Sequence, residues 1–230
     1  MQGFYVSASD VTAERNRERE LMGAIIKGQE QERKRLGAEL HDGIGQVLSA
    51  ISLDVSQIQD ETTAKSPEMS DELKKLGSKV QTAIREVRNI SHDLMPEVLE
   101  SFGLREAVRQ VCDNLQERTG MEVTLNHADL ESRYDTAIEV NIFRMCQELL
   151  NNIQKHASSA KVFVSLMDHG ETISLTVEDE GVGFDPQAEH PGIGLKNVRS
   201  RVSSLGGTLD MESAADSGTL INVEIPKLQE

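Results

Sequence analysis

The chain has 230 residues, a formal net charge of −15 and only 3% aromatic residues, with no tryptophan. An acidic chain with so few rings offers neither a basic surface nor a stacking platform, which argues against direct nucleic-acid binding. No stretch reaches the roughly 20 apolar residues of a membrane span, and residues 1–20 are polar and charged, without the pattern expected of a secretory signal. Cys112 and Cys146 lie in apolar helical patterns, which predicts buried free thiols in a reducing compartment.

The chain begins with a stretch that predicts one short strand, residues 1–9, followed by a charged helix. Asp10 or Thr12 is a plausible N-cap, and the helix is expected to run from about Val11 to about Gln59. A strand that leads into a charged helix resembles the end of a PAS sensor domain. Residues 1–27 are therefore expected to be the end of a truncated sensor domain with its signalling helix, the sensor itself being missing from this chain.

Apolar residues recur along the first helix at steps of three and four, as on a helix that packs against other helices. They are Leu36, Leu40, Ile44, Val47, Ile51, Val55 and Ile58. A second helix with the same pattern follows a polar break that ends at Pro67, and it stops at Pro96. Two such helices cannot bury both seams alone, which predicts a homodimeric antiparallel four-helix bundle. A monomeric hairpin packed on the rest of the chain is the alternative.

His41 lies one residue past a seam position, so its ring is expected to point toward solvent. Asp42 follows it, and Gln46 comes four residues later on the same helix face. A neutral imidazole can attack phosphorus when a neighbouring carboxylate orients the ring. Gly43 and Gly45 cost helix stability and are interpreted as keeping this surface bare. An ordinary solvated His-Asp pair is the alternative interpretation.

After Pro96 the pattern changes to mixed helices and strands in the order α, β, α, β, β, α, β, β. The spacing of apolar residues in these elements, and the order in which the elements follow one another, predict a mixed sheet covered by helices on one side. The expected elements are a helix at 104–118, a strand at 121–126, a helix at 136–156, strands at 161–167 and 172–178, a loop at 179–194, a helix at 195–205, and strands at 208–211 and 219–225.

Three clusters in this half suggest a nucleotide site. Glu148, Asn152 and Lys155 or His156 share one face of the long helix, where an amide oxygen suits Mg2+ and a cation suits phosphate. A solvated polar stripe is the alternative there. Asp179 lies at a strand end and is followed by Gly181 and Gly183. Its carboxylate can accept a hydrogen bond from an exocyclic amine, and the glycines let the backbone pass close to a flat ring. A plain turn has the same pattern. The third cluster offers free backbone N–H groups to phosphate at a helix start, and it comprises Gly192, Gly194 and Leu195, with Gly218 and Thr219 on the last strand.

In this order and spacing the motifs resemble those of two-component sensor histidine kinases, in the subfamily of the nitrate-sensor and membrane-fluidity-sensor kinases, over residues 28–226. The resemblance implies an α+β fold in which a dimeric antiparallel four-helix bundle precedes a Bergerat-type α/β sandwich. It places dimerisation and histidine phosphotransfer in residues 28–96 and ATP binding in residues 97–230. A departure is the loop at residues 185–191, which is shorter than the ATP lid of many histidine kinases.

By this resemblance His41 is the phosphoacceptor, Asp42 activates it, and Gln46 positions the water that dephosphorylates the partner. Asn152 is the Mg2+ ligand, with the adjacent Asn151 as a less well spaced alternative. The residues that the resemblance assigns to ATP are Glu148, Asn152, Lys155, His156, Asp179, Gly181, Gly183, Gly192, Gly194, Leu195, Gly218 and Thr219.

The implied function is ATP-dependent autophosphorylation of His41, with phosphoryl transfer to an Asp of a response-regulator receiver domain and phosphatase activity toward that regulator. The expected partners are a second copy of the chain and a regulator with a LuxR-type DNA-binding output. This part of the protein is expected in the cytoplasm, and membrane attachment of the full-length protein is left open.

Two rival functions remain. One is a degenerate scaffold that binds nucleotide without turnover, and the other is an ATP-driven clamp of the gyrase or mismatch-repair type, in which Glu148 would activate water. His92, which precedes Asp93, is a weaker candidate for a second phosphoacceptor because no glutamine follows its acid at the spacing of Gln46.

Overall fold

The computed structural model describes residues 5–62, 66–94, 97–131, 133–185 and 192–227. The chain divides into two compact units: Lys27–Glu97, and a second unit composed of Met1–Ile26 and Val98–Glu230. We call them the helical unit and the sheet unit and describe each by itself. None of the helices in the described ranges is both long and apolar enough to cross a lipid bilayer.

The N-terminal helices are α1 (Tyr5–Glu39), a π-helical turn η1 (Leu40–Gly45), α2 (Gln46–Thr62) and α3 (Pro67–Leu94). The strand predicted at the start is wrong for residues 5–9, which lie in α1, and the rest of that prediction falls outside the described residues. Residues 5–9 therefore do not form the strand on which the resemblance to the end of a PAS domain was partly based. The break before Pro67 is placed as predicted, although residues 63–65 lie outside the described part.

Within the helical unit, α3 runs antiparallel to the helices before it. Gln81 donates from Nε2 to Ser52 Oγ of α2 at 2.8 Å. Further along α3, the buried Ser91 hydroxyl donates to the Gly37 carbonyl of α1 at 3.0 Å. As residue numbers rise along α3, the numbers of its partners fall, which defines the direction of the hairpin.

One hairpin buries only part of its apolar seams. Val55 and Val80 are 6% and 9% exposed, because they face each other's helices across α2 and α3. Most other seam side chains stay between 38% and 60% exposed. Those exposed side chains are Leu36, Ile44, Val47, Ile51, Ile58, Leu76 and Ile90. The helical unit by itself therefore leaves an apolar face uncovered.

The sheet unit follows the predicted order of helices and strands. It comprises α4 (Glu97–Thr119), β1 (Glu122–Ala128), α5 (Thr136–Asn152), a π-helical turn η2 (Ile153–Ala157), β2 (Lys161–Asp168), β3 (Thr172–Asp179), α6 (Ile193–Ser204), β4 (Thr208–Ser213) and β5 (Thr219–Pro226). The strands form one sheet in the order β1-β2-β3-β5-β4, with β1 and β2 parallel and the other pairs antiparallel.

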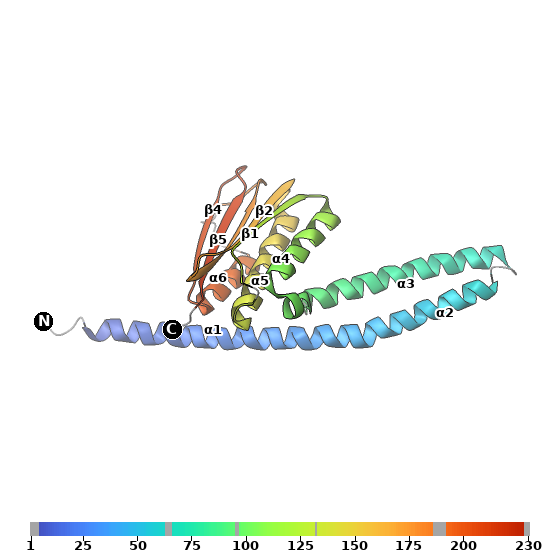
Figure 1. The fold of residues 1–230 in the computed structure, drawn as a ribbon, viewed down its shortest axis with the longest axis horizontal. Coiled ribbons are helices and arrows are strands. Elements are labelled where there is room, and N and C mark those ends of the chain that lie inside the picture. Colours follow the sequence, from blue (N-terminus) through green and yellow to red (C-terminus); the bar gives the residue numbers. More distant parts are fainter. Residues whose placement is uncertain (1–4, 63–65, 95–96, 132, 186–191, 228–230) are drawn as a thin grey trace. The chain divides into compact units, whose positions relative to one another are not determined.

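Helices α4, α5 and α6 cover one face of this sheet (Figure 1). Strand alternation explains the single covered face: Val162, Val164 and Leu166 of β2 are buried, whereas Lys161 before them and Phe163 between them are exposed. The apolar face meets buried residues of the three helices in one core. The predicted mixed sheet with one-sided helical cover is confirmed.

The cysteines are buried and free, as predicted. Cys112 of α4 and Cys146 of α5 are 2% and 0% exposed. Burial raises the pKa of the Cys112 thiol to about 12 and raises that of Cys146 as well. Both thiols are therefore protonated at neutral pH and unreactive.

Helix α4 begins at Glu97, seven residues earlier than predicted from the pattern at Leu104. Gly103 interrupts it with φ of 80°, a backbone conformation that favours glycine. The short segment before this kink is nevertheless anchored, because Leu99 is 3% exposed within the core.

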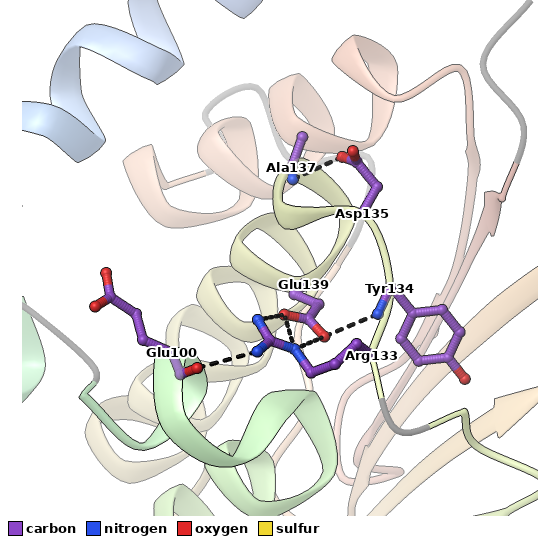
Figure 2. Close-up of polar contacts among 6 residues, drawn as sticks. All are labelled: Glu100, Arg133, Tyr134, Asp135, Ala137 and Glu139. Atoms are coloured by element: carbon purple, nitrogen blue, oxygen red, sulfur yellow. Dashed lines mark hydrogen bonds and ion pairs between the residues drawn. The ribbon is translucent and has the colours of Figure 1, made fainter.

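A polar cluster joins the start of α4 to the start of α5 (Figure 2). The Glu139 side chain is 2% exposed and accepts hydrogen bonds from the Arg133 guanidinium, with an Nη2–Oε2 distance of 2.9 Å. The Tyr134 backbone N–H donates to the same carboxylate at 2.9 Å. Arg133 also donates to the Glu100 carbonyl of α4 at 3.1 Å. Glu139 thus has the partners that a buried charge needs.

Replacing Glu139 by Ala should therefore destabilise the sheet unit. The Tyr134 N–H loses its acceptor and the loop loses its ion pair, so we expect a loss of about 2–3 kcal/mol in unfolding free energy, measured by urea denaturation. Glu106→Ala is the matched control, because that partly exposed carboxylate pairs with the exposed Arg109. Equal losses for the two variants would contradict the importance of the buried cluster.

Candidate active site

The first candidate centre lies on the helical unit at His41. Its side chain is 61% exposed, and Nδ1 lies 3.0 Å from Asp42 Oδ1, whose side chain is 71% exposed. A ring that donates from Nδ1 to a carboxylate carries its lone pair on Nε2. The exposed orientation expected from the seam is what the structure shows. The geometry presents an oriented, solvent-facing imidazole nitrogen on the helix.

His41 lies in a π-helical turn, which the sequence analysis had treated as regular α-helix. Such turns are rare and occur frequently at functional sites. Within the turn, a side chain added at Gly43 would meet nothing within 4 Å, and one at Gly45 would come no closer than 3.7 Å to the Leu40 carbonyl. The two glycines are therefore not required by packing within the chain.

Gln46 is the first residue of α2 and is exposed, as is Asp42 one turn earlier. Both side chains are therefore accessible to a molecule that approaches His41. The side chains of His92 and Asp93, the weaker candidate pair, lie outside the described residues.

The second candidate centre is a cavity of about 440 Å³ in the sheet unit. This volume is within the range of small-molecule sites. Eight of the residues predicted from the sequence line the cavity: Asn152, His156, Asp179, Gly183, Gly192, Gly194, Leu195 and Thr219. Three elements far apart in sequence thus converge as predicted: the end of α5, the end of β3 and the start of α6.

The end of α5 and the start of α6 meet at Gly194. A Cβ at this position would lie 2.2 Å from Glu148 Oε1 and 3.1 Å from the Asn152 amide. Absence of a side chain therefore lets the first turn of α6 reach the polar face of α5. Gly192 is the N-cap of α6, so the free N–H groups of this helix start beside Asn152. Such N–H groups favour a phosphate.

Asp179 lies at the end of β3 and is 5% exposed. The Gly181 backbone N–H donates to its Oδ1 at 2.8 Å, and the Thr219 hydroxyl donates to the same carboxylate. Burial raises the pKa of Asp179 above its usual range, and the two hydrogen bonds oppose this rise. The carboxylate is thus an acceptor on an otherwise apolar wall.

Four predicted nucleotide residues lie outside the cavity wall. Glu148 lies against the start of α6, as described above. Gly181 and Gly218 lie behind the wall, where the Gly218 N–H donates to the Gly181 carbonyl at 2.9 Å. Gly218 has φ of 72°, and a Cβ there would lie 2.0 Å from the Asp179 carbonyl. Lys155 is exposed on η2 and is not among the lining residues.

Sequence reasoning missed the apolar walls. These are Leu149, Ile153, Val177, Met211 and Ile221. They suit the faces of a flat ring, but their helical or strand periodicity is that of core residues, so no sequence signal separates the two roles. Asp185 lines the cavity at the last described residue before the loop, and residues 186–191, which include most of the short loop, lie outside the described part.

The donor set fits a magnesium ion that is shared with a phosphate chain. Asn152 is half-buried on the cavity wall, whereas Asn151 is exposed, which favours Asn152 as the amide ligand. Among the described residues, no group of three or more His, Cys, Asp or Glu side chains could hold a metal by itself. Mg2+ commonly takes one or two protein oxygens and completes its shell with phosphate and water.

Comparison with known proteins identifies both units. The model of the family described as histidine kinase, HisKA_3, matches residues 32–99. The model described as histidine kinase-, DNA gyrase B-, and HSP90-like ATPase matches residues 137–229. A solved histidine kinase domain from the blue-light activated kinase EL346 of Erythrobacter litoralis has a TM-score of 0.51 and 20% identity, covering 87% of this chain and 94% of that one. This likeness shows the shared fold.

Curated relatives agree with these matches. Sensor histidine kinase MctS of Rhizobium johnstonii is 32% identical, covering 88% of this chain and 45% of the relative. The kinase/phosphatase DegS of Brevibacillus brevis is 31% identical, with 91% and 55% covered, and the oxygen sensor kinase NreB of Staphylococcus carnosus is 34% identical, with 93% and 61% covered. The chain spans about half the length of these relatives. It belongs to the HisKA_3-type sensor histidine kinases and contains their catalytic core.

Proposed function

We propose that the protein transfers the γ-phosphoryl group of ATP, bound in the cavity of the sheet unit, to Nε2 of His41. The observation that carries the proposal is the exposed His41–Asp42 pair, with its 3.0 Å contact at Nδ1. A gyrase-type clamp has no use for such a nucleophile, and the HisKA_3 match covers this segment. Residues 28–96 would then serve dimerisation and phosphotransfer, and residues 97–230 would bind ATP.

The geometry supports a simple division of roles at the imidazole. The Nδ1 proton stays on the bond to Asp42, which stabilises positive charge on the ring as Nε2 forms its bond to phosphorus. The bond between the γ-phosphorus and the bridging oxygen breaks, and ADP leaves with the electron pair. Bound Mg2+ supplies charge neutralisation on the phosphates, and Asn152, supported by the nearby Glu148, would hold it.

In the cavity, Asp179 would accept a hydrogen bond from the 6-amino group of adenine between the apolar walls. The start of α6, with Gly192 and Gly194, would bind the phosphates through backbone N–H groups. His156 lines the same cavity and is a further phosphate contact in this proposal, whereas Lys155 would have to reorient to reach it.

A second copy of the chain would cover the exposed seam of the helical unit. The uncovered side chains lie on α1, η1, α2 and α3, so two hairpins together form a four-helix bundle. Burial of this face is the physical reason to propose a homodimer. The same argument disfavours the monomeric hairpin.

The acceptor of the phosphoryl group would be an Asp of a response-regulator receiver domain. A phosphatase activity toward that regulator is supported by the name of the relative DegS, a kinase/phosphatase, and by the exposed Gln46 near His41. The resemblance to the nitrate-sensor and membrane-fluidity-sensor kinases supports a LuxR-type output on the regulator. Because ATP and the receiver domain are cytoplasmic, the proposed site of action of this core is the cytoplasm.

Replacing His41 by Gln should abolish autophosphorylation and retain nucleotide binding, because the glutamine cannot form the phosphoramidate. Labelled ATP should give the wild type an acid-labile, base-stable phosphate and leave the variant at background. His127→Gln, an exposed histidine of β1, is the matched control and should label normally. Label on the His41 variant would refute the assignment. A wild type that binds ATP without labelling would favour the scaffold, and steady ATP hydrolysis without labelling would favour the clamp.

Replacing Gln46 by Ala should leave autophosphorylation within about twofold and slow dephosphorylation of a receiver domain about tenfold or more, because a water then loses its positioning group. The measurement is the decay of phosphorylated regulator after ATP removal. Gln57→Ala on the same helix is the control, since that side chain is also exposed. Equal decay with both variants would reject the role of Gln46.

Replacing Asp179 by Asn should weaken ADP binding about 10- to 100-fold, as expected when a charged acceptor is lost, and should raise the melting temperature at pH 7.5. Burial raises the pKa of Asp179 in the folded state above the ordinary value of 3.8 that it has in the unfolded chain. As pH rises past 3.8 the unfolded state therefore loses its proton first, the folded state holds more protons, and the free energy of unfolding falls. The variant lacks this cost, and its advantage should shrink below that pH. Calorimetry gives both quantities. Asp210→Asn, exposed on β4, should change neither, and unaltered ADP affinity in the Asp179 variant would contradict the assignment.

A further inference from the structure

Ser213, the last residue of β4, contacts three groups around the cavity without lining it. The Phe184 backbone N–H donates to its Oγ at 2.9 Å. The hydroxyl donates to the Gly218 carbonyl at 2.9 Å, and its oxygen lies 3.1 Å from the Thr219 hydroxyl oxygen. Phe184 and Thr219 both line the cavity. One half-buried hydroxyl thus connects two separate segments of the cavity wall.

The register of the sheet explains why these groups meet. Ser213 of β4 is paired with Thr219 of β5, and Thr219 is paired with Asp179 of β3. Directly paired residues on neighbouring strands project to the same face of a sheet. The three polar side chains therefore form one row across three strands, with Asp179 at one end and Ser213 at the other.

The hydrogen bonds around Ser213 leave its neighbours in a fixed arrangement. The Phe184 N–H donates to Ser213, and the Thr219 hydroxyl donates to Asp179. Ser213 and Thr219 have one hydroxyl proton each, so Ser213 gives its proton to the Gly218 carbonyl while the Thr219 proton is on Asp179. Ser213 therefore links the Phe184 backbone to the peptide that directly precedes Thr219.

We propose that Ser213 is a positioning residue for recognition of the adenine base, acting through Thr219 and Phe184. It fixes the Gly218 carbonyl, and with it the backbone that carries Thr219, and it fixes the backbone at Phe184. The Thr219 hydroxyl is thereby held against Asp179, so that the carboxylate stays in place for the exocyclic amine of the nucleotide. This inference rests on the proposed function, in which Asp179 reads the 6-amino group. Ser213 touches no part of the nucleotide in this arrangement.

The test compares Ser213→Thr with Ser213→Val, which have nearly the same shape and differ in the hydroxyl. Calorimetry measures the affinity of each for ADP and for inosine diphosphate, which has an oxygen in place of the 6-amino group and, like ADP, cannot phosphorylate His41. The Val variant should bind ADP about tenfold more weakly than the Thr variant, as expected for one supporting hydrogen bond. Both should bind inosine diphosphate within about twofold of the wild type.

Ser174→Ala is the control for loss of a buried hydroxyl in the same sheet. Ser174 lies on β3, where its hydroxyl meets His169 Nε2 at 2.9 Å at the hairpin end, remote from Asp179 in the strand. This variant should keep the wild-type preference for ADP even where its melting temperature falls. Equal ADP affinities of the Thr and Val variants would overturn the role of Ser213. A wild type with no preference for ADP over inosine diphosphate would instead overturn the proposed role of Asp179.

Discussion

A buried carboxylate in an apolar wall is the constraint around which the sheet unit is arranged. Asp179 is 5% exposed, and an ionised group in such a place is costly unless it is hydrogen-bonded. The chain supplies part of the compensation through the Gly181 N–H and the Thr219 hydroxyl. The Thr219 donor lies next to backbone that passes close to Asp179, because a Cβ at Gly218, where φ is 72°, would lie 2.0 Å from the Asp179 carbonyl. A ligand with an amino group would donate a further hydrogen bond to this carboxylate. Binding would then offset part of the free-energy cost of burying Asp179.

Local sequence patterns were sufficient to predict the order of helices and strands in the sheet unit, but not to distinguish a π-helical turn from α-helix. Strands such as β2 and β3 alternate between a covered and an open face, and this alternation is visible in the sequence. The π-helical turns η1 and η2 were missed because apolar residues three or four apart are compatible with both helix types. The early start of α4 was missed because Gly103 interrupts the pattern. The strand predicted over residues 1–9 was wrong at residues 5–9, because so short a run defines no period and these residues continue the helix that follows them.

The polar residues of the cavity could be predicted because they belong to short motifs with a recognisable order and spacing along the chain. The residues of its apolar walls have the same spacing as core residues of any helix or strand. Lys155 shows the limit of helical spacing. Lys155 or His156 was placed on the face of Asn152 by α-helical spacing. The chain here forms the π-helical turn η2, whose wider turn brings the fourth residue after Asn152 closer to its face than the third, and His156 lines the cavity whereas Lys155 does not. Ser213 shows a different limit, since its neighbours Phe184 and Thr219 are brought to it by strand pairing that no local pattern encodes.

The π-helical turn at Leu40–Gly45 has a mechanical consequence for the long N-terminal rod. A π-helical turn accommodates about one residue more than an α-helical turn, and one residue corresponds to about 100° around the axis. If this turn were to tighten into α-helix, α2 would rotate by that angle relative to α1. Torque applied to α1 would thus be absorbed at the six residues that contain His41, the proposed phosphoacceptor.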